Sequence, residues 1–186
     1  MSRTSSRSTS VLSLARASSF ALAAALAAAL AAGCASFDGR GLVPGQSTLN
    51  DVERVMGRPA DQRVGPQGEV VYWYPQLPYG RASYAARIAP DGHLIAVEQR
   101  LTEDNIKRVV KGVSADEVRD LLGPPWEPTI FSRLEREVWT YPMLVQGYGY
   151  PKWFVVQLSL DDHAVQEAFL MDDPTAVPKD TPSRRW

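Results

Sequence analysis

The chain has 186 residues, of which 45% are hydrophobic and 22% are charged. This composition is typical of a globular protein with one or two small domains, and its single cysteine excludes a disulfide bond within the chain. Without the three arginines of residues 1–33 the formal net charge falls from −1 to −4, which argues against nucleic acid or an anionic membrane surface as an electrostatic partner.

Residues 1–33 have the pattern of a targeting segment. Arg3, Arg7 and Arg16 give it a positive start, and an apolar, alanine-rich run follows over residues 20–32. The run is shorter than the roughly 20 residues that a membrane-spanning helix needs. We therefore expect a signal peptide that is removed from the mature protein.

The segment ends in the pentapeptide LAAGC, which places Cys34 last and resembles the lipobox of bacterial lipoproteins. The resemblance implies cleavage before Cys34, with diacylglycerol on its sulfur and an acyl chain such as palmitate on its new N-terminus. Ala35 stands where an aspartate would signal inner-membrane retention, which implies a periplasm-facing position at the outer membrane. Several acyl chains hold a protein firmly, since each buried methylene contributes about 0.8 kcal/mol. The alternative is a simple secretory signal with an incidental cysteine.

After an irregular tether over residues 34–41, two similar stretches appear, Gly45–Pro59 and Gly112–Pro125. Each contains a glycine, a hydroxyl residue, about two turns of apolar residues at helical spacing, and a Gly-x-Pro stop. Isolated helices shorter than about 12 residues are marginal in water. Both predicted helices must therefore pack against later parts of the chain.

The ends of these two helices are marked by capping signals. Thr48 and Ser114 each precede an acidic residue by three positions, which is the spacing of a capping box. Gly57 and Gly123 follow the last turns, where glycine is expected to take the left-handed conformation. A further helix is expected over residues 102–111.

The similarity continues beyond the helices. Val71–Pro75 matches Val138–Pro142, and Asp91–His93 matches Asp161–His163. Alternating apolar and β-branched residues predict strands in both halves. The expected strands are 61–64, 70–74, 82–89 and 93–101 in the first half, and 129–131, 138–141, 153–160 and 164–171 in the second.

These elements predict an α+β fold of two tandem repeats, residues 42–101 and 102–171, followed by a disordered tail over residues 172–186. Short helices should cover one face of a curved antiparallel sheet, and the other face can stay open to water. The side chains expected on the covered face are Tyr72, Tyr74, Trp139, Tyr141, Phe154, Val156 and Leu158. Trp73, Trp153 and Val155 are expected on the open face.

The motif of each repeat resembles the SmpA/OmlA (BamE-like) family of outer-membrane lipoproteins. The matching positions are Gly45, Thr48, Val52, Gly57, Pro59, Tyr72 and Tyr74, and Gly112, Ser114, Val118, Gly123, Pro125, Trp139 and Tyr141. The resemblance implies an envelope protein as partner, with the β-barrel assembly machinery as one candidate. The tandem arrangement also resembles β-lactamase inhibitor protein, in which two such units share one long curved sheet that grips its target.

The sequence offers little catalytic chemistry. Only two histidines occur, His93 and His163, and each lies near an aspartate in a predicted turn. A metal site from Asp91, Asp161 and these histidines, or an enzyme that uses them, is an alternative to exposed turn residues. No glycine-rich phosphate loop or metal-spaced cysteine cluster appears, so we predict no enzyme, no cofactor and no metal.

Two loops rich in aromatic and apolar residues, 75–80 and 142–151, are the predicted contact surface, because Tyr and Met are enriched at interfaces. The alternative is that they only cover an open edge or face of the sheet. The candidate partner-binding residues are Leu77, Tyr79, Met143, Leu144, Tyr148 and Tyr150, with Trp73 and Trp153 on the open face. The predicted function is that of a periplasmic protein-binding scaffold, and the alternative is an inhibitor-like or ligand-binding module that uses the open face.

Overall fold

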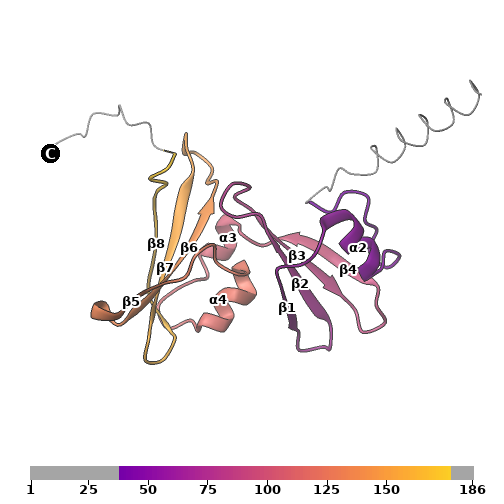
Figure 1. Cartoon of the computed structure of the whole chain (residues 1–186), viewed down its shortest axis with the longest axis horizontal. Helices are drawn as coiled ribbons and strands as arrows, with labels where there is room; N and C mark the ends of the chain where they lie inside the picture. Colours follow the sequence, from indigo (N-terminus) through magenta and orange to yellow (C-terminus); the bar gives the residue numbers. More distant parts are fainter. Residues whose placement is uncertain (1–37, 177–186) are drawn as a thin grey trace, which may run out of the picture. The chain divides into compact units, whose positions relative to one another are not determined.

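A computed structural model describes residues 38–176 of the chain (Figure 1). The predicted signal peptide and Cys34 lie outside the described residues. The helices are α2 (Leu49–Met56), α3 (Glu103–Ile106), α4 (Ala115–Leu122) and the 3-10 helix η1 (Ser132–Leu134). The strands are β1 (Asp61–Val64), β2 (Val70–Pro75), β3 (Ser83–Ile88), β4 (Leu94–Gln99), β5 (Thr129–Phe131), β6 (Arg136–Met143), β7 (Lys152–Ser159) and β8 (Val165–Asp172). In this part of the chain no helix has the length and apolar character to cross a membrane.

The strands form two antiparallel sheets, sheet 1 with the order β1-β2-β3-β4 and sheet 2 with the order β5-β6-β7-β8. The predicted α+β class and its two tandem helix-plus-strand repeats are confirmed. The single curved sheet that was expected is replaced by two sheets, because no strand of one repeat pairs with a strand of the other.

The duplication extends to individual backbone hydrogen bonds. Gly45 N donates to Leu94 O at 2.8 Å, and Gly112 N donates to Val165 O at 2.8 Å. The register of the third strand against the fourth also shifts at equivalent places, between residues 87 and 88 in sheet 1 and between residues 157 and 158 in sheet 2. Shared irregularities of this kind indicate that both repeats have the same backbone plan.

The helix α4 of the second repeat has the predicted capping box. Ser114 Oγ accepts from Glu117 N at 3.3 Å, and the Glu117 carboxylate accepts from Ser114 N at 2.9 Å. These hydrogen bonds from Ser114 lower the pKa of Glu117. In the first repeat, the Asp51 carboxylate accepts from the backbone and hydroxyl of Thr48 at 2.9 and 2.8 Å.

Replacing the Ser114 hydroxyl tests the contribution of this cap. We expect Ser114→Ala to lower the free energy of unfolding by about 1 kcal/mol, because an N-terminal amide of α4 loses its acceptor. Urea denaturation followed by circular dichroism measures the change. Ser114→Thr keeps a hydroxyl at the same position and serves as the control, so an equal loss in both variants would contradict a role for the cap.

The conformation after the last turn differs from the prediction. Gly57 has φ 85° and ψ −164°, and Gly123 has φ 85° and ψ −172°. The positive φ is as expected, but ψ is extended instead of left-handed helical. Essentially only glycine populates this region.

Two expected boundaries also change. The helix predicted over residues 102–111 is a single turn, α3, although Thr102 caps it by accepting from Asn105 N at 3.2 Å. The β-branched Val109 and Val110, which disfavour helix, follow this turn. At the other end, Asp173, expected in the tail, is buried; residues 177–186 lie outside the described residues.

Each sheet packs one face, its inner face, against the helix of its own repeat. Val52 and Met56 of α2 share a core with Tyr74 of sheet 1, and Val118 and Leu122 of α4 belong to the core of sheet 2. The seven side chains predicted on the covered face all lie in, or against, these two cores. The strand alternation is therefore confirmed.

Candidate functional site

The outer face of sheet 1, opposite α2, carries an unusual number of charges. Asp61, Trp73, Ala85 and Glu98 are paired across four strands and so point to the same side. Further charged side chains on this face are Arg63, Glu69, Arg87 and Arg100. A face with so many charges needs either water or charged partners.

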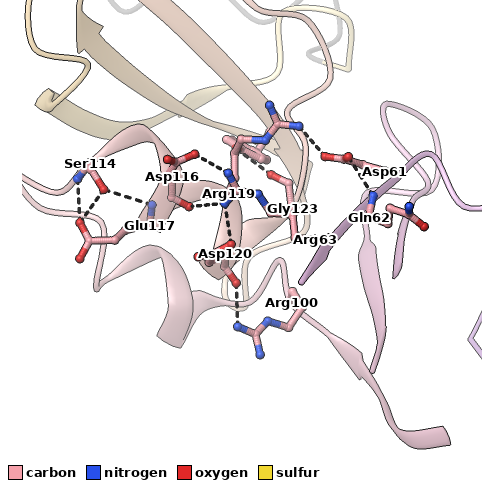
Figure 2. Close-up of polar contacts among 11 residues, drawn as sticks. Asp61, Gln62, Arg63, Arg100, Ser114, Asp116, Glu117, Arg119, Asp120 and Gly123 are labelled. Atoms are coloured by element: carbon pink, nitrogen blue, oxygen red, sulfur yellow. Dashed lines mark hydrogen bonds and ion pairs between the residues drawn. The ribbon is translucent and has the colours of Figure 1, made fainter. Parts of the chain in front are cut away.

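The partners come from α4 of the second repeat (Figure 2). Arg119 Nη2 lies 2.5 Å from Asp61 Oδ2, and Arg63 pairs with Asp120 at 2.7 Å and also with Asp116. Asp116 lies in the first turn of α4. Its pairing with Arg63 depends on the packing of one repeat against the other, which no local sequence pattern predicts.

Gly123, at the end of α4, lies directly against the outer face of sheet 1. A Cβ atom added to Gly123 would lie 2.6 Å from Trp73 Cε3 and 2.6 Å from Ser83 Oγ. The Gly123 carbonyl accepts from Tyr141 Oη at 3.1 Å. Gly123 thus contacts one repeat through its Cα and the other through its carbonyl.

This contact corrects the assignment of Trp73 to an open surface. Trp73 is on the predicted face but is only 2% exposed. Its ring is covered by Gly123 and cannot meet a partner without separation of the repeats. Trp153, on the equivalent face of sheet 2, is half-buried.

A cavity of about 260 Å³ remains beside Trp73. Arg63, Arg87 and Arg100 line it together with Glu69, Glu98 and Asp120. Arg100 Nη1 lies 3.0 Å from Glu98 Oε2, whereas Arg87 Nη2 lies 3.9 Å from Glu98 Oε1. The acidic and basic groups largely neutralise one another, so the cavity has no strong preference for an ion.

The two predicted contact loops divide into buried and exposed residues. Met143 is 1% exposed, and Leu77 packs against the core of the second repeat. These two residues, predicted to bind a partner, are instead part of the packing, because Met143 is the last residue of β6 and the loop that carries Leu77 packs against the core of sheet 2. The other four are exposed: Tyr79 by 90%, Leu144 by 68%, Tyr148 by 56% and Tyr150 by 43%.

A buried lysine orders the second loop. The Lys152 ammonium lies 4.1 Å from the Tyr148 ring centroid and 4.9 Å from that of Tyr150, and it pairs with Asp172. Its hydrogen bond to Asp172 raises the pKa of Lys152. Cation–π contacts and an ion pair therefore hold two exposed tyrosines in place, a role for Lys152 that sequence reasoning missed.

A second buried charge links the first loop to the end of β8. Asp173, 2% exposed, accepts from Thr175 N at 2.8 Å and pairs with Arg81 at 3.3 Å. Burial alone would raise the pKa of Asp173, but the hydrogen bonds from Thr175 and Arg81 outweigh it and lower the pKa. The two repeats are thus joined at this place as well.

The outer face of sheet 2 is largely apolar and aromatic, although Glu167 also lies on it. Thr140, Val155 and Phe169 are paired across three strands, and Trp153 is paired with Met171. Val155, which was expected on an open surface, is only 5% exposed. Trp126 meets Trp153 edge to face, with ring centroids 5.8 Å apart. In Figure 1, α3 and α4 lie on the other side of this sheet, and no helix among residues 38–176 covers the outer face.

The histidines do not form a site with one another. His93 Nδ1 lies 3.4 Å from Asp91, and His163 is exposed in the equivalent turn of the other repeat. Within residues 38–176, no three His, Cys, Asp or Glu side chains are grouped in a way that would hold a metal ion.

No protein-family model and no curated protein matches the chain. Among solved structures, a DUF4309 family protein (YjgB) from Bacillus subtilis subsp. subtilis str. 168 is 19% identical, with 72% of this chain and 84% of that chain covered and a TM-score of 0.27. A "putative beta-lactamase inhibitor protein" from Streptococcus mutans is 12% identical, with 68% of this chain and 83% of that chain covered and a TM-score of 0.26. These values are too low to support an argument about function, which therefore rests on the residues described above.

Proposed function

We propose that this chain is a lipid-anchored protein-binding module of the bacterial envelope, with no catalytic role of its own. The observation that carries the proposal is the ordered, exposed cluster of Leu144, Tyr148 and Tyr150, which we call the tyrosine loop. Large exposed aromatic side chains are typical of interfaces. Because Lys152 and Asp172 already hold the loop in place, binding would cost little conformational entropy.

The position of the module in the cell is proposed from the sequence. The lipobox at Cys34 supports an outer-membrane anchor, and the repeat motif supports a relation to the SmpA/OmlA family. An envelope protein, with a subunit of the β-barrel assembly machinery as one candidate, is the partner that these two features favour.

The test is recovery of a partner with the acylated chain after crosslinking in its own cells. We expect Tyr148→Ser combined with Tyr150→Ser to reduce recovery of the main crosslinked protein at least tenfold, because the loop loses both aromatic contacts. Val110→Ser removes an apolar side chain of similar exposure, 57%, at another place and should leave recovery unchanged. Quantitative mass spectrometry of the recovered proteins gives the ratio.

Equal recovery from the double variant and the Val110 variant would contradict binding through the tyrosine loop. In the same cells, Cys34→Ala should move the protein from the membrane fraction to the soluble fraction. Retention in the membrane would contradict the lipid anchor and leave the binding result unaffected.

The second candidate function is an inhibitor-like or ligand-binding module that uses the open face. The edge-to-face contact of Trp126 and Trp153 on the outer face of sheet 2 favours it. Tryptophan emission is expected to shift when a partner covers this face, while the buried Trp73 should contribute little to the change.

A further inference from the structure

We infer that the outer face of sheet 2 receives a short helix of another protein, in the way that the outer face of sheet 1 receives α4. The inference rests on the proposed function in one respect, namely that the chain binds protein. It names a different surface from the tyrosine loop and the chemistry of its occupant.

The backbone defines which positions of the two sheets are equivalent. Ala60 N donates to Trp73 O at 2.9 Å, and Trp126 N donates to Thr140 O at 3.0 Å. Thr140 therefore occupies the position of Trp73, and Trp126 that of Ala60. By the same strand pairing, Arg63, Arg87, Glu98 and Arg100 of sheet 1 correspond to Thr129, Gln157, Phe169 and Met171 of sheet 2.

The change of residues across these positions indicates the chemistry of the occupant. In sheet 1 the four positions are charged, and α4 meets two of them with Asp116 and Asp120. In sheet 2 the same four positions hold uncharged residues, whereas Glu127 follows Trp126 at the position of Asp61, which Arg119 of α4 meets in sheet 1. At the four uncharged positions a charged side chain of the occupant would lose its hydration without gaining a partner, so the residues that contact them should be apolar.

The size of the residues also differs. On sheet 1 the large Trp73 ring leaves room only for a glycine of α4. On sheet 2 the smaller Thr140 lies at that position, with Trp126 and Trp153 beside it. The occupant can therefore place an apolar side chain where α4 places Gly123.

A second copy of this chain does not fit this description. Sequence alignment of the repeats places Asn50, Glu53 and Arg54 of α2 at the positions of the α4 residues that contact sheet 1. Glu53 would then face Glu127, at the position of Asp61, and Arg54 would face the uncharged Thr129, so neither charge would gain a partner of opposite sign. Residues 177–186 do not match either, since they carry four charged residues and two prolines in ten positions, a poor composition for an apolar helix.

The experiment uses two neighbouring positions on opposite faces of β8. Met171 is 41% exposed on the outer face, and Leu170 is 39% exposed on the inner face. A photoreactive amino acid is placed at either position, or at Tyr148, in the full acylated chain, which is then irradiated in its own cells. We expect position 171 to give an adduct with another protein that position 170 does not give.

Two further results are required for support. The crosslinked peptide, identified by mass spectrometry, should lie in a helix with apolar side chains at spacings of three and four residues. For the second result, the photoreactive group replaces the exposed Glu167 of the outer face. In that background, Phe169→Glu combined with Met171→Arg restores the charges of sheet 1 and should reduce the adduct at least tenfold. Thermal unfolding of the double variant shows whether it has kept its fold, and Met171→Arg alone replaces it if it has not.

The contrary outcomes are distinct from one another. An adduct with a second copy, an adduct with residues 177–186 of the same chain, or the same adduct from positions 170 and 171 overturns the inference. An adduct at position 148 without one at 171 overturns it and leaves the proposed function standing. The absence of adducts at all three positions overturns both.

Discussion

Gly123→Ala is expected to lower the free energy of unfolding by about 3 to 4 kcal/mol, whereas Gly57→Ala should lower it by about 1 to 2 kcal/mol. Both glycines end equivalent helices at φ 85°, so both variants strain the backbone by a similar amount. Only at Gly123 would the added methyl group collide with Trp73 and Ser83, whereas a Cβ at Gly57 meets no atom within 4 Å. Overpacking of this kind typically adds 1 to 3 kcal/mol.

The pair of variants isolates the contact between the repeats from the strain of the turn. Urea denaturation followed by circular dichroism measures both free energies under one condition. Trp73 fluorescence should also shift toward that of an exposed tryptophan in Gly123→Ala. Equal destabilisation by the two substitutions would show that α4 does not press on the outer face of sheet 1 in solution.

Asp173→Asn is expected to lower the free energy of unfolding by about 2 to 3 kcal/mol at neutral pH. The substitution leaves Arg81, which is itself largely buried, without its charged partner, and breaking a buried pair from one side is costly. Asp104→Asn is the matched control. Asp104 also has one basic partner, Lys107, but their side chains are 91% and 69% exposed, so its loss should cost less.

The same aspartate predicts a dependence on pH. Its pKa is lower in the folded protein than the usual value of about 3.9 in an unfolded chain. The ionised form therefore stabilises the fold above that value, and this contribution is lost as the pH falls through the folded pKa. The difference between the native protein and Asp173→Asn should shrink below about pH 4. A difference that stays constant into acid would contradict the ion pair with Arg81.

The elements that the sequence predicted well depend on local rules. Ser114 and Glu117 satisfy each other within one turn, and the period of two along β2 and β6 decides which side chains share a face. Neither rule needs information from distant residues. The helices α2 and α4, most of the strands and the assignment of inner and outer faces were therefore determined by the sequence itself.

The availability of each surface was decided by the tertiary structure. Alternation placed Trp73 on the outer face, but only the approach of α4 from the other repeat buries it. Leu77 and Met143 are residue types that are common at interfaces, yet Leu77 packs against the core of sheet 2 and Met143 ends strand β6 within it, whereas Tyr148 stays exposed beside Lys152. Strand periodicity predicts the face of the sheet on which a side chain lies. It does not predict which element covers that face, because the covering element comes from a distant part of the chain.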